Sequence, residues 1–524
     1  MTILAHQAGV IPAGPRLWWE RRRFVAVLMA LATIPLLYPA NPPLVDIFGH
    51  MGRYRVQLDL HHSPALQQFF GFKWAAIGNL GVDLLMEPLG RLLGLEPAVK
   101  LVILAIPPLT VAGFLWVARE VHHRLPPTAI FALPLAYSFP FLFGFANFTL
   151  AMALAMLAFA LWLRLGERDH ERLRALCFVP ISFILFFTHA FGWGTLGLLC
   201  FSAEAVRQHD RGARWFGAVW RAALQASVMA LPILFMLLWR SGQSVQLTYG
   251  WFDWQMKWEW VYSALRDRWK WFDIGTVALL GCVLVYAAVH RRLEFSRNLA
   301  FSGLVLLAAF LILPWTIFGS AYADMRILPY VLALALLAIR FKGRTPYRFG
   351  RTIAVLGLAV FGVRVAGTTA SLAMAANDQQ AKLGALDHVP IGARLVHLTG
   401  QRCDHLWALP RNSHLGAMAI VRRQAFSNDQ WSIAGANLLS VHYPQAEPFA
   451  ADPSQIVRPE ACATRRILPI DSALAAIPRG AFDYLWLIDV PPPDPRRLEG
   501  MRLVWHGPGS MLYAIGDSGG QPQQ

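Results

Sequence analysis

The chain has 524 residues, of which 56% are hydrophobic and only 15% are charged. Because soluble proteins carry about 25% charged residues, this composition excludes a string of ordinary soluble domains. The net charge is +16, from 47 basic and 31 acidic residues, and in a soluble protein it would suggest nucleic-acid binding. Here the basic residues fall in alternating loops between apolar segments, which indicates a membrane topology and no nucleic-acid partner.

Apolar runs of about 18 or more residues predict membrane-spanning helices. We predict eleven of them, at 24–40, 100–118, 128–146, 148–165, 174–188, 190–206, 217–239, 274–290, 299–318, 327–341 and 352–373. Arginines gather before the first span and in every second loop, so the positive-inside rule places residues 1–23 in the cytoplasm. With an odd number of spans the C-terminal region is external, in the periplasm if the membrane is a bacterial inner membrane.

Residues 41–99 form the first predicted external loop. From Leu80 to Leu93, leucines recur at helical spacing while charged residues mark the other side. This pattern predicts an amphipathic helix lying in the plane of the membrane interface. The aromatic residues upstream are typical of an interfacial belt, and they are Phe69, Phe70, Phe72 and Trp74.

Residues 240–273 form a second predicted external loop, rich in tryptophan with lysine and arginine between. One interpretation is anchoring at the membrane interface. The other is a platform for a sugar or lipid headgroup, because aromatic rings stack on sugars and basic groups bind phosphate. Trp251 and Trp254 are the candidate substrate contacts in this loop.

Residues 374–516 are more charged and contain short strand-like segments, which predict a small external α/β domain. The last two segments, 502–505 and 511–515, are expected to form a hairpin, and residues 517–524 to be disordered. Cys403 and Cys462 both fall in this region. An even pair in an oxidising compartment predicts a disulfide, and no cysteine or histidine spacing indicates a zinc site.

The segment after the first span places an acid, an imidazole and a guanidinium at the head of the external loop. Asp46, His50 and Arg53 are spaced four and three residues apart, so in a helix they share one face. They form either an internal ion pair or a site in which Asp46 is a general base and the basic groups bind an anionic substrate.

Three further polar positions lie at external breaks between predicted spans. Arg326, two residues after Asp324, is either a residue paired or snorkelling at a helix end or a phosphate clamp. His189 is either a hydrogen-bonded packing residue or a donor ligand, and Asn147 is most often a helix cap. All of these positions reach the same predicted face as Asp46.

The layout resembles the GT-C superfamily of integral-membrane glycosyltransferases, which includes protein mannosyltransferases and aminoarabinose transferases. More narrowly, it resembles a group of bacterial membrane proteins with four short motifs. These are D-x-x-x-H-x-x-R (Asp46, His50, Arg53), N-L-x-x-D (Asn79, Leu80, Asp83), G-F-x-N-F (Gly144 to Phe148) and A-D-x-R (Ala323 to Arg326). The superfamily acid signature is usually paired, whereas Asp46 has no adjacent acid, which leaves the use of a divalent metal open.

The resemblance implies an all-α polytopic enzyme, over residues 24–373, that transfers a sugar from a polyprenyl-phosphate donor to an external acceptor with inversion. Asp46 is then the base, and the donor phosphate is bound by Arg53, Arg326, His50 and His189. The substrate-binding candidates are Asn79, Asp83, Asn147, Asp324, Trp251 and Trp254. No organic cofactor is expected, and the other partners are membrane lipids. The alternatives are a transporter or flippase for a lipid-linked or anionic substrate, and a non-enzymatic envelope assembly protein.

Overall fold

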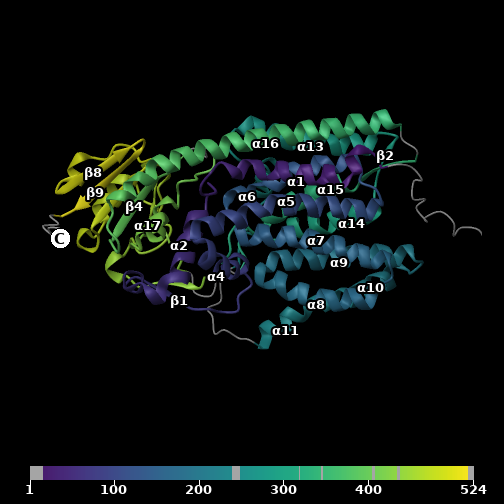
Figure 1. The fold of residues 1–524 in the computed structure, drawn as a ribbon, viewed down its shortest axis with the longest axis horizontal. Coiled ribbons are helices and arrows are strands. Elements are labelled where there is room, and N and C mark those ends of the chain that lie inside the picture. Colours follow the sequence, from purple (N-terminus) through teal and green to yellow (C-terminus); the bar gives the residue numbers. More distant parts are fainter. Residues whose placement is uncertain are drawn as a thin grey trace, which may run out of the picture.

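A computed structural model describes residues 16–238, 248–317, 319–343, 346–403, 407–432, 437–465 and 467–516. Figure 1 shows a long bundle of helices with a mixed β-sheet at one end, and α16 (Tyr347–Leu383) running from the bundle toward that sheet. The predicted disordered segment 517–524 lies outside the described residues.

Each of the eleven predicted spans overlaps a helix. The helices of the bundle are α1 (Arg22–Leu37), α5 (Leu95–His122), a 3-10 helix (Pro127–Tyr137) continued by α6 (Phe139–Phe143), α7 (Ala146–Glu167), α8 (Glu171–Thr188), α9 (Ala190–Asp210), α10 (Trp215–Ala226), α11 (Leu231–Leu238), α13 (Lys270–Val289), α14 (Arg297–Ile312), α15 (Ala323–Leu337) and α16. α7 is central, since it packs against α5, α8 and α9.

Within the described residues, five helical segments are long and apolar enough to cross a membrane. They are Leu95–His122, Ala146–Glu167, Trp215–Phe235, Lys270–Val289 and Tyr347–His388. Large apolar side chains also point outward from the bundle, including Phe216, Leu176 and Val289. Such exposure is costly in water and favourable in lipid. The count of eleven spans and their orientation stay predictions.

The first loop folds into α2 (Ile47–Asp59), α3 (Pro64–Gln67), β1 (Phe70–Phe72) and α4 (Gly81–Leu93). α4 is amphipathic as its leucine pattern predicts, with Val82 and Met86 buried and Leu92 exposed. The predicted aromatic belt is wrong for Phe69 and Phe70, because both are buried against Phe426. Their ring area is covered by protein and is therefore not available to the interface.

The C-terminal region contains a five-stranded mixed sheet in the order β6-β4-β7-β9-β8. β4 (Leu395–Gly400) is parallel to β6 (Ile456–Val457) and β7 (Tyr484–Ile488), and the predicted hairpin is β8 (Met501–Gly507) with β9 (Ser510–Ile515). The structure bonds the sulfurs of Cys403 and Cys462, whose Cα atoms are 5.4 Å apart.

The first loop and the C-terminal region share one hydrophobic core. β1 pairs antiparallel with β5 (Leu439–Val441), and Val56 and Leu66 of the first loop cluster with Val396 and Leu485 of the sheet. In addition, α17 (Met418–Arg423) packs against α2. The C-terminal region is therefore built onto the loop that carries Asp46.

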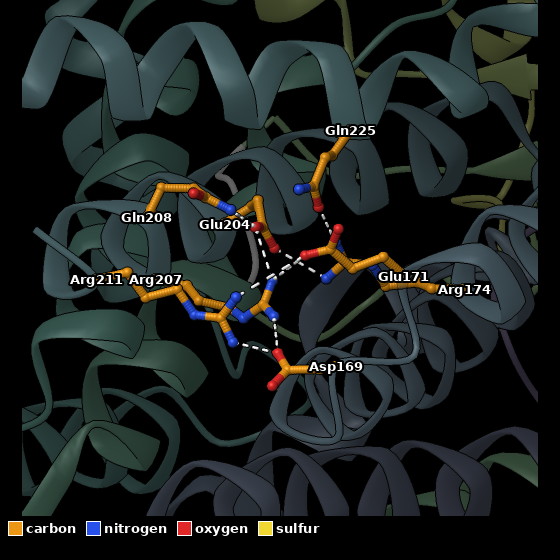
Figure 2. A network of polar contacts seen from close by, with 8 residues as sticks. All are labelled: Asp169, Glu171, Arg174, Glu204, Arg207, Gln208, Arg211 and Gln225. Carbon is orange, nitrogen blue, oxygen red and sulfur yellow. Dashed lines mark hydrogen bonds and ion pairs between the residues drawn. The ribbon is translucent and has the colours of Figure 1, made fainter. Parts of the chain in front are cut away.

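The arginines between α7 and α10 form a compact polar network. Figure 2 shows Arg174, Arg207 and Arg211 among the carboxylates of Asp169, Glu171 and Glu204. Buried Glu204 accepts from Arg174 and from Arg207, each at 2.9 Å. Three positive and three negative side chains are thus matched at these helix ends.

Candidate active site

Asp46 lies where α2 begins, held against the segment that precedes α7. Its backbone N–H donates to the carbonyl of Phe143 at 2.9 Å. Gly144 has φ of +102°, and a Cβ there would lie 2.8 Å from the Asp46 nitrogen. Only glycine tolerates both the left-handed backbone and this close approach. The G-F-x-N-F motif therefore fixes the position of Asp46.

The imidazole of His414 lies among three carboxyl groups. Its Nε2 is 3.9 Å from Asp46 Oδ1 and 4.0 Å from Asp452 Oδ1, and its Nδ1 is 3.8 Å from Asp429 Oδ2. Asp46 and Asp452 are partly exposed, with 14% and 22% of their side chains accessible, whereas Asp429 is fully buried. The cluster therefore reaches from the interior to the surface.

Burial governs the charges of this cluster. It raises the pKa of Asp46 well above its ordinary value, and Asp452 raises it further while the charge of Arg326 lowers it. Burial also raises the pKa of Asp429 to about 8. The pKa of His414 is lowered by burial, against an opposing effect of Asp452. Burial and the charge of Asp452 thus disfavour ionisation of Asp46 and of Asp429.

His50 lies near the same cluster, and the ring of Trp431 contacts both His50 and His414. The His50 ring lies 5.0 Å from that of Trp431, which is 4.5 Å from the ring of His414. A Cβ at Gly49 would lie 2.6 Å from Trp431, so the glycine allows α2 to approach this segment closely. Burial and the charge of Arg53 lower the pKa of His50 well below its ordinary value, so the ring is neutral.

Arg326 and His189 meet beside Asp46 at the start of α15 and between α8 and α9. The Arg326 Nη1 is 3.2 Å from His189 Nε2, and its Nη2 donates to the carbonyl of Ala321 at 3.1 Å. The guanidinium also lies 4.2 Å from the ring centroid of Phe145. The His189 Nδ1 is also 3.1 Å from the backbone nitrogen of Phe191, and because a neutral imidazole accepts at only one nitrogen, His189 accepts either from Arg326 or from Phe191.

Arg326 differs from the other buried cations of the bundle. Within the described ranges its side chain contacts a histidine, a carbonyl and three aromatic rings, and forms no ion pair with a carboxylate. Its Nε is buried and has no hydrogen-bond partner. The guanidinium of Arg326 therefore keeps a donor that an anion would satisfy.

The structure gives Arg53 and three other predicted site residues a shared network. Arg53 pairs with Asp83 at 2.9 Å, and both are buried. The Asn147 side-chain nitrogen donates to Asp83 at 3.1 Å and to the side-chain oxygen of Asn79 at 2.9 Å, while its oxygen accepts the N–H of Val82. Three of the motifs thus hold α2, α4 and α7 together, and the Arg53 guanidinium is paired with α4.

The other predicted contacts also have partners of their own. Asp324 pairs with Lys257 at 3.1 Å and accepts from the indole of Trp260 in α12 (Trp254–Tyr262), so it does not pair with Arg326. Trp251 and Trp254 are exposed and flank Phe252. The ring of Phe252 lies 6.4 Å from that of Trp251 and 6.0 Å from that of Trp254, so the two tryptophans are grouped around Phe252. Part of their loop, 239–247, lies outside the described residues.

The sequence analysis missed His414, Asp429, Trp431 and Asp452. All four come from the region that was predicted to be a separate domain, and they lie 368 or more positions after Asp46. The run Ser427 to Gln430 reads as a polar surface turn, yet its residues are buried. Among the residues that the structure describes, no group of three or more histidine, cysteine, aspartate or glutamate side chains is placed to hold a metal ion.

No model of a known protein family matches the chain, and no curated protein matches it by sequence. Two solved structures of ArnT from Cupriavidus metallidurans are similar to it. The one bound to undecaprenyl phosphate has a TM-score of 0.46 and 12% identity, covering 96% of this chain and 99% of that chain. The apo structure has a TM-score of 0.47 and 12% identity, covering 96% of this chain and 98% of that chain.

Proposed function

We propose that this chain is a membrane glycosyltransferase of the GT-C type, which transfers a sugar from a polyprenyl-phosphate donor to an acceptor hydroxyl. The observation that carries the proposal is the proximity of Asp46 and Arg326 at one end of an apolar helix bundle. Asp46 is a partly exposed acid that feels the charge of Arg326, a buried guanidinium for which the described residues provide no ion-pair partner. An acid and an anion site side by side are what this displacement requires.

An apolar groove on the bundle supports a lipid donor. It has a volume of about 240 Å³ and is lined by Trp116, Leu154, Leu157, Ala158, Leu161, Ile181, Ile184 and Leu185 of α5, α7 and α8. Leu185 lies one helical turn before His189. A hydrocarbon chain in this groove would therefore place a phosphate headgroup close to His189 and Arg326, whereas a water-soluble nucleotide sugar would gain nothing from it.

In the proposed reaction, Asp46 removes the proton from the acceptor hydroxyl. The oxygen attacks the anomeric carbon while the bond from that carbon to the phosphate oxygen breaks. Arg326, which lies beside His189, binds the departing polyprenyl phosphate. Removing one such preorganised donor typically costs about 3–4 kcal/mol of transition-state stabilisation. A single displacement without a covalent enzyme intermediate inverts the anomeric centre.

Asp46→Asn tests the proposal directly. We would supply membranes containing the full chain with synthetic polyprenyl-phosphate hexoses, pentoses and aminopentoses, and measure release of polyprenyl phosphate. Wild type should release it from at least one donor, and Asp46→Asn should lose the activity while keeping its expression level. Asp59→Asn is the matched control, because Asp59 ends the same helix and contacts Arg55 on the other side.

Two results would reject the proposal. Full activity of Asp46→Asn would remove the base. Absence of release by the wild type from every donor, with lipid-linked sugar instead crossing sealed vesicles, would favour the transporter alternative.

A further inference from the structure

The imidazole of His414 bridges an acid of the first loop and an acid of the C-terminal region. Nε2 faces Asp46 at 3.9 Å, and Nδ1 faces Asp429 at 3.8 Å. The Nδ1 of His414 and the facing Oδ2 of Asp429 are both buried, and the described residues offer neither of them a hydrogen-bond partner. Leaving two such atoms unpaired costs free energy, and a proton between them, after a shift of under about 1 Å, would satisfy both.

We propose that His414 and Asp429 are positioning residues of the Asp46 site, which hold on Asp429 a proton that would otherwise neutralise Asp46. The inference rests on the proposed function only in giving Asp46 the part of a base. The coupling of the two carboxyl groups through the imidazole stands on the geometry alone.

The exchange balances without any further reactant. In the active state Asp46 is ionised and accepts the Nε2–H of His414, while protonated Asp429 donates to Nδ1. In the other state the Asp429 proton has passed to Nδ1 and the Nε2 proton has passed to Asp46. One proton is gained by Asp46 and one is lost by Asp429, so the pair always carries one.

Solvent access favours the active state, because 14% of the Asp46 side chain is exposed whereas Asp429 is fully buried. Asp452 raises the pKa of both carboxyl groups, Arg326 lowers that of Asp46, and hydrogen bonds from Gln430 and Ser427 partly offset the effect of burial on Asp429. Burial keeps the His414 ring neutral, as a proton carrier requires. The titratable and charged groups that face the array are Asp452, Arg326, Tyr322, His50 and His397.

The fold supports this assembly by docking the C-terminal segment onto α2. Gln430 donates to the carbonyl of Gly49 at 3.2 Å, and a Cβ at Gly52 would lie 2.6 Å from the Gln430 side chain. His414 and Asp429 flank α17, which packs against the same helix. A side chain at Gly49 or Gly52 would push this segment away from α2. The two glycines therefore help to keep Asp46, His414 and Asp429 at fixed positions relative to one another.

The test is infrared spectroscopy of the full chain in lipid nanodiscs, which reports protonated carboxyl groups without any substrate. Wild type should show a protonated carboxyl that titrates near pH 8 and is lost in Asp429→Asn. In His414→Phe a second protonated carboxyl should appear at neutral pH, and it should vanish when Asp46→Asn is added. His414→Gln keeps hydrogen-bonding groups if the phenylalanine variant folds poorly, and exposed His506→Ala is the control.

Once a sugar donor has been identified, enzyme kinetics test the role of His414 independently. His414→Ala should lower kcat about 10²-fold, within the range for general acid–base effects, with KM for the donor changed less than about threefold and partial rescue by added imidazole. The proposal fails if Asp46 has the same protonation in wild type and in both His414 variants. If the infrared data show the coupling of Asp46 and Asp429 but the chain transfers no sugar, the proposed function is rejected and the coupling stands.

Discussion

The ion pair between Arg53 and Asp83 gives the sharpest prediction about which motif residues are structural. The two side chains meet at 2.9 Å, with 5% and 1% of their area exposed. Removing one member of a buried pair leaves the other charge uncompensated and typically costs about 3–5 kcal/mol. Asp83→Leu should therefore lower the free energy of unfolding by about that amount, and Asn147, which also donates to Asp83, adds to the loss.

The double variant Arg53→Met with Asp83→Leu separates packing from function. Replacing both members of a buried pair by apolar groups is often neutral or stabilising, so the double variant should recover most of the stability that Asp83→Leu loses. Unfolding in mixed micelles with increasing dodecyl sulfate, followed by tryptophan fluorescence, measures each variant. Arg53→Met alone is the third corner of the cycle.

Two outcomes would refute this reasoning. A loss below about 1 kcal/mol in Asp83→Leu would mean that Arg53 finds another partner or water. If the double variant is stable but cannot release polyprenyl phosphate, Arg53 binds the donor phosphate, as the sequence motif predicts.

Four further predictions follow from other parts of the molecule. Arg326→Lys keeps the charge but loses the planar fork, so KM for the donor should rise with little change in stability, and unchanged donor binding in Arg326→Ala would end the phosphate assignment. Free thiols at Cys403 and Cys462 in exported protein, by non-reducing mass spectrometry, would contradict the bridge, whose removal should cost about 4 kcal/mol in the chain-entropy model. Because burial raises the pKa of Asp429 to about 8, the folded chain keeps a proton that the unfolded chain releases above about pH 4. The free energy of unfolding should therefore fall between about pH 4 and pH 8, and less so in Asp429→Asn. A reporter active only in the periplasm, fused after Ala514, should be active, and a cytoplasmic result would require an even number of spans.

The helices were predictable because apolar runs of the right length have few alternatives. Every predicted span overlaps a helix, although α16 continues ten residues beyond its predicted end at 373. It does so because its polar continuation packs in the C-terminal region, where Gln379 donates to the carbonyl of Arg411. Hydropathy locates the apolar part of a helix, but it does not predict a polar extension that is stabilised by tertiary contacts.

The site was only half predictable for a related reason. Asp46, His189 and Arg326 stood out because charge next to an apolar span is costly. His414 and Asp429 lie in a polar region, where an acid or a histidine is ordinary and no local pattern marks it. The pairing of β1 with β5 and the shared core decide that these residues face Asp46, and three-residue strands joined across the chain leave no periodic signal.

Buried arginines at the two ends of the bundle show how partners distinguish structure from binding. Arg174 is buried with Glu204, and Arg207 meets three carboxylates, so both arginines are neutralised without a ligand. Arg326 is equally buried, yet its contacts are a histidine, a carbonyl and aromatic rings. A desolvated cation without an adjacent anion lowers stability, and a bound phosphate would repay that cost. Within the part of the chain that the structure describes, no carboxylate forms an ion pair with Arg326, although the charge of Asp46 acts on it, so an anionic group of the substrate would supply the direct partner that Arg326 lacks.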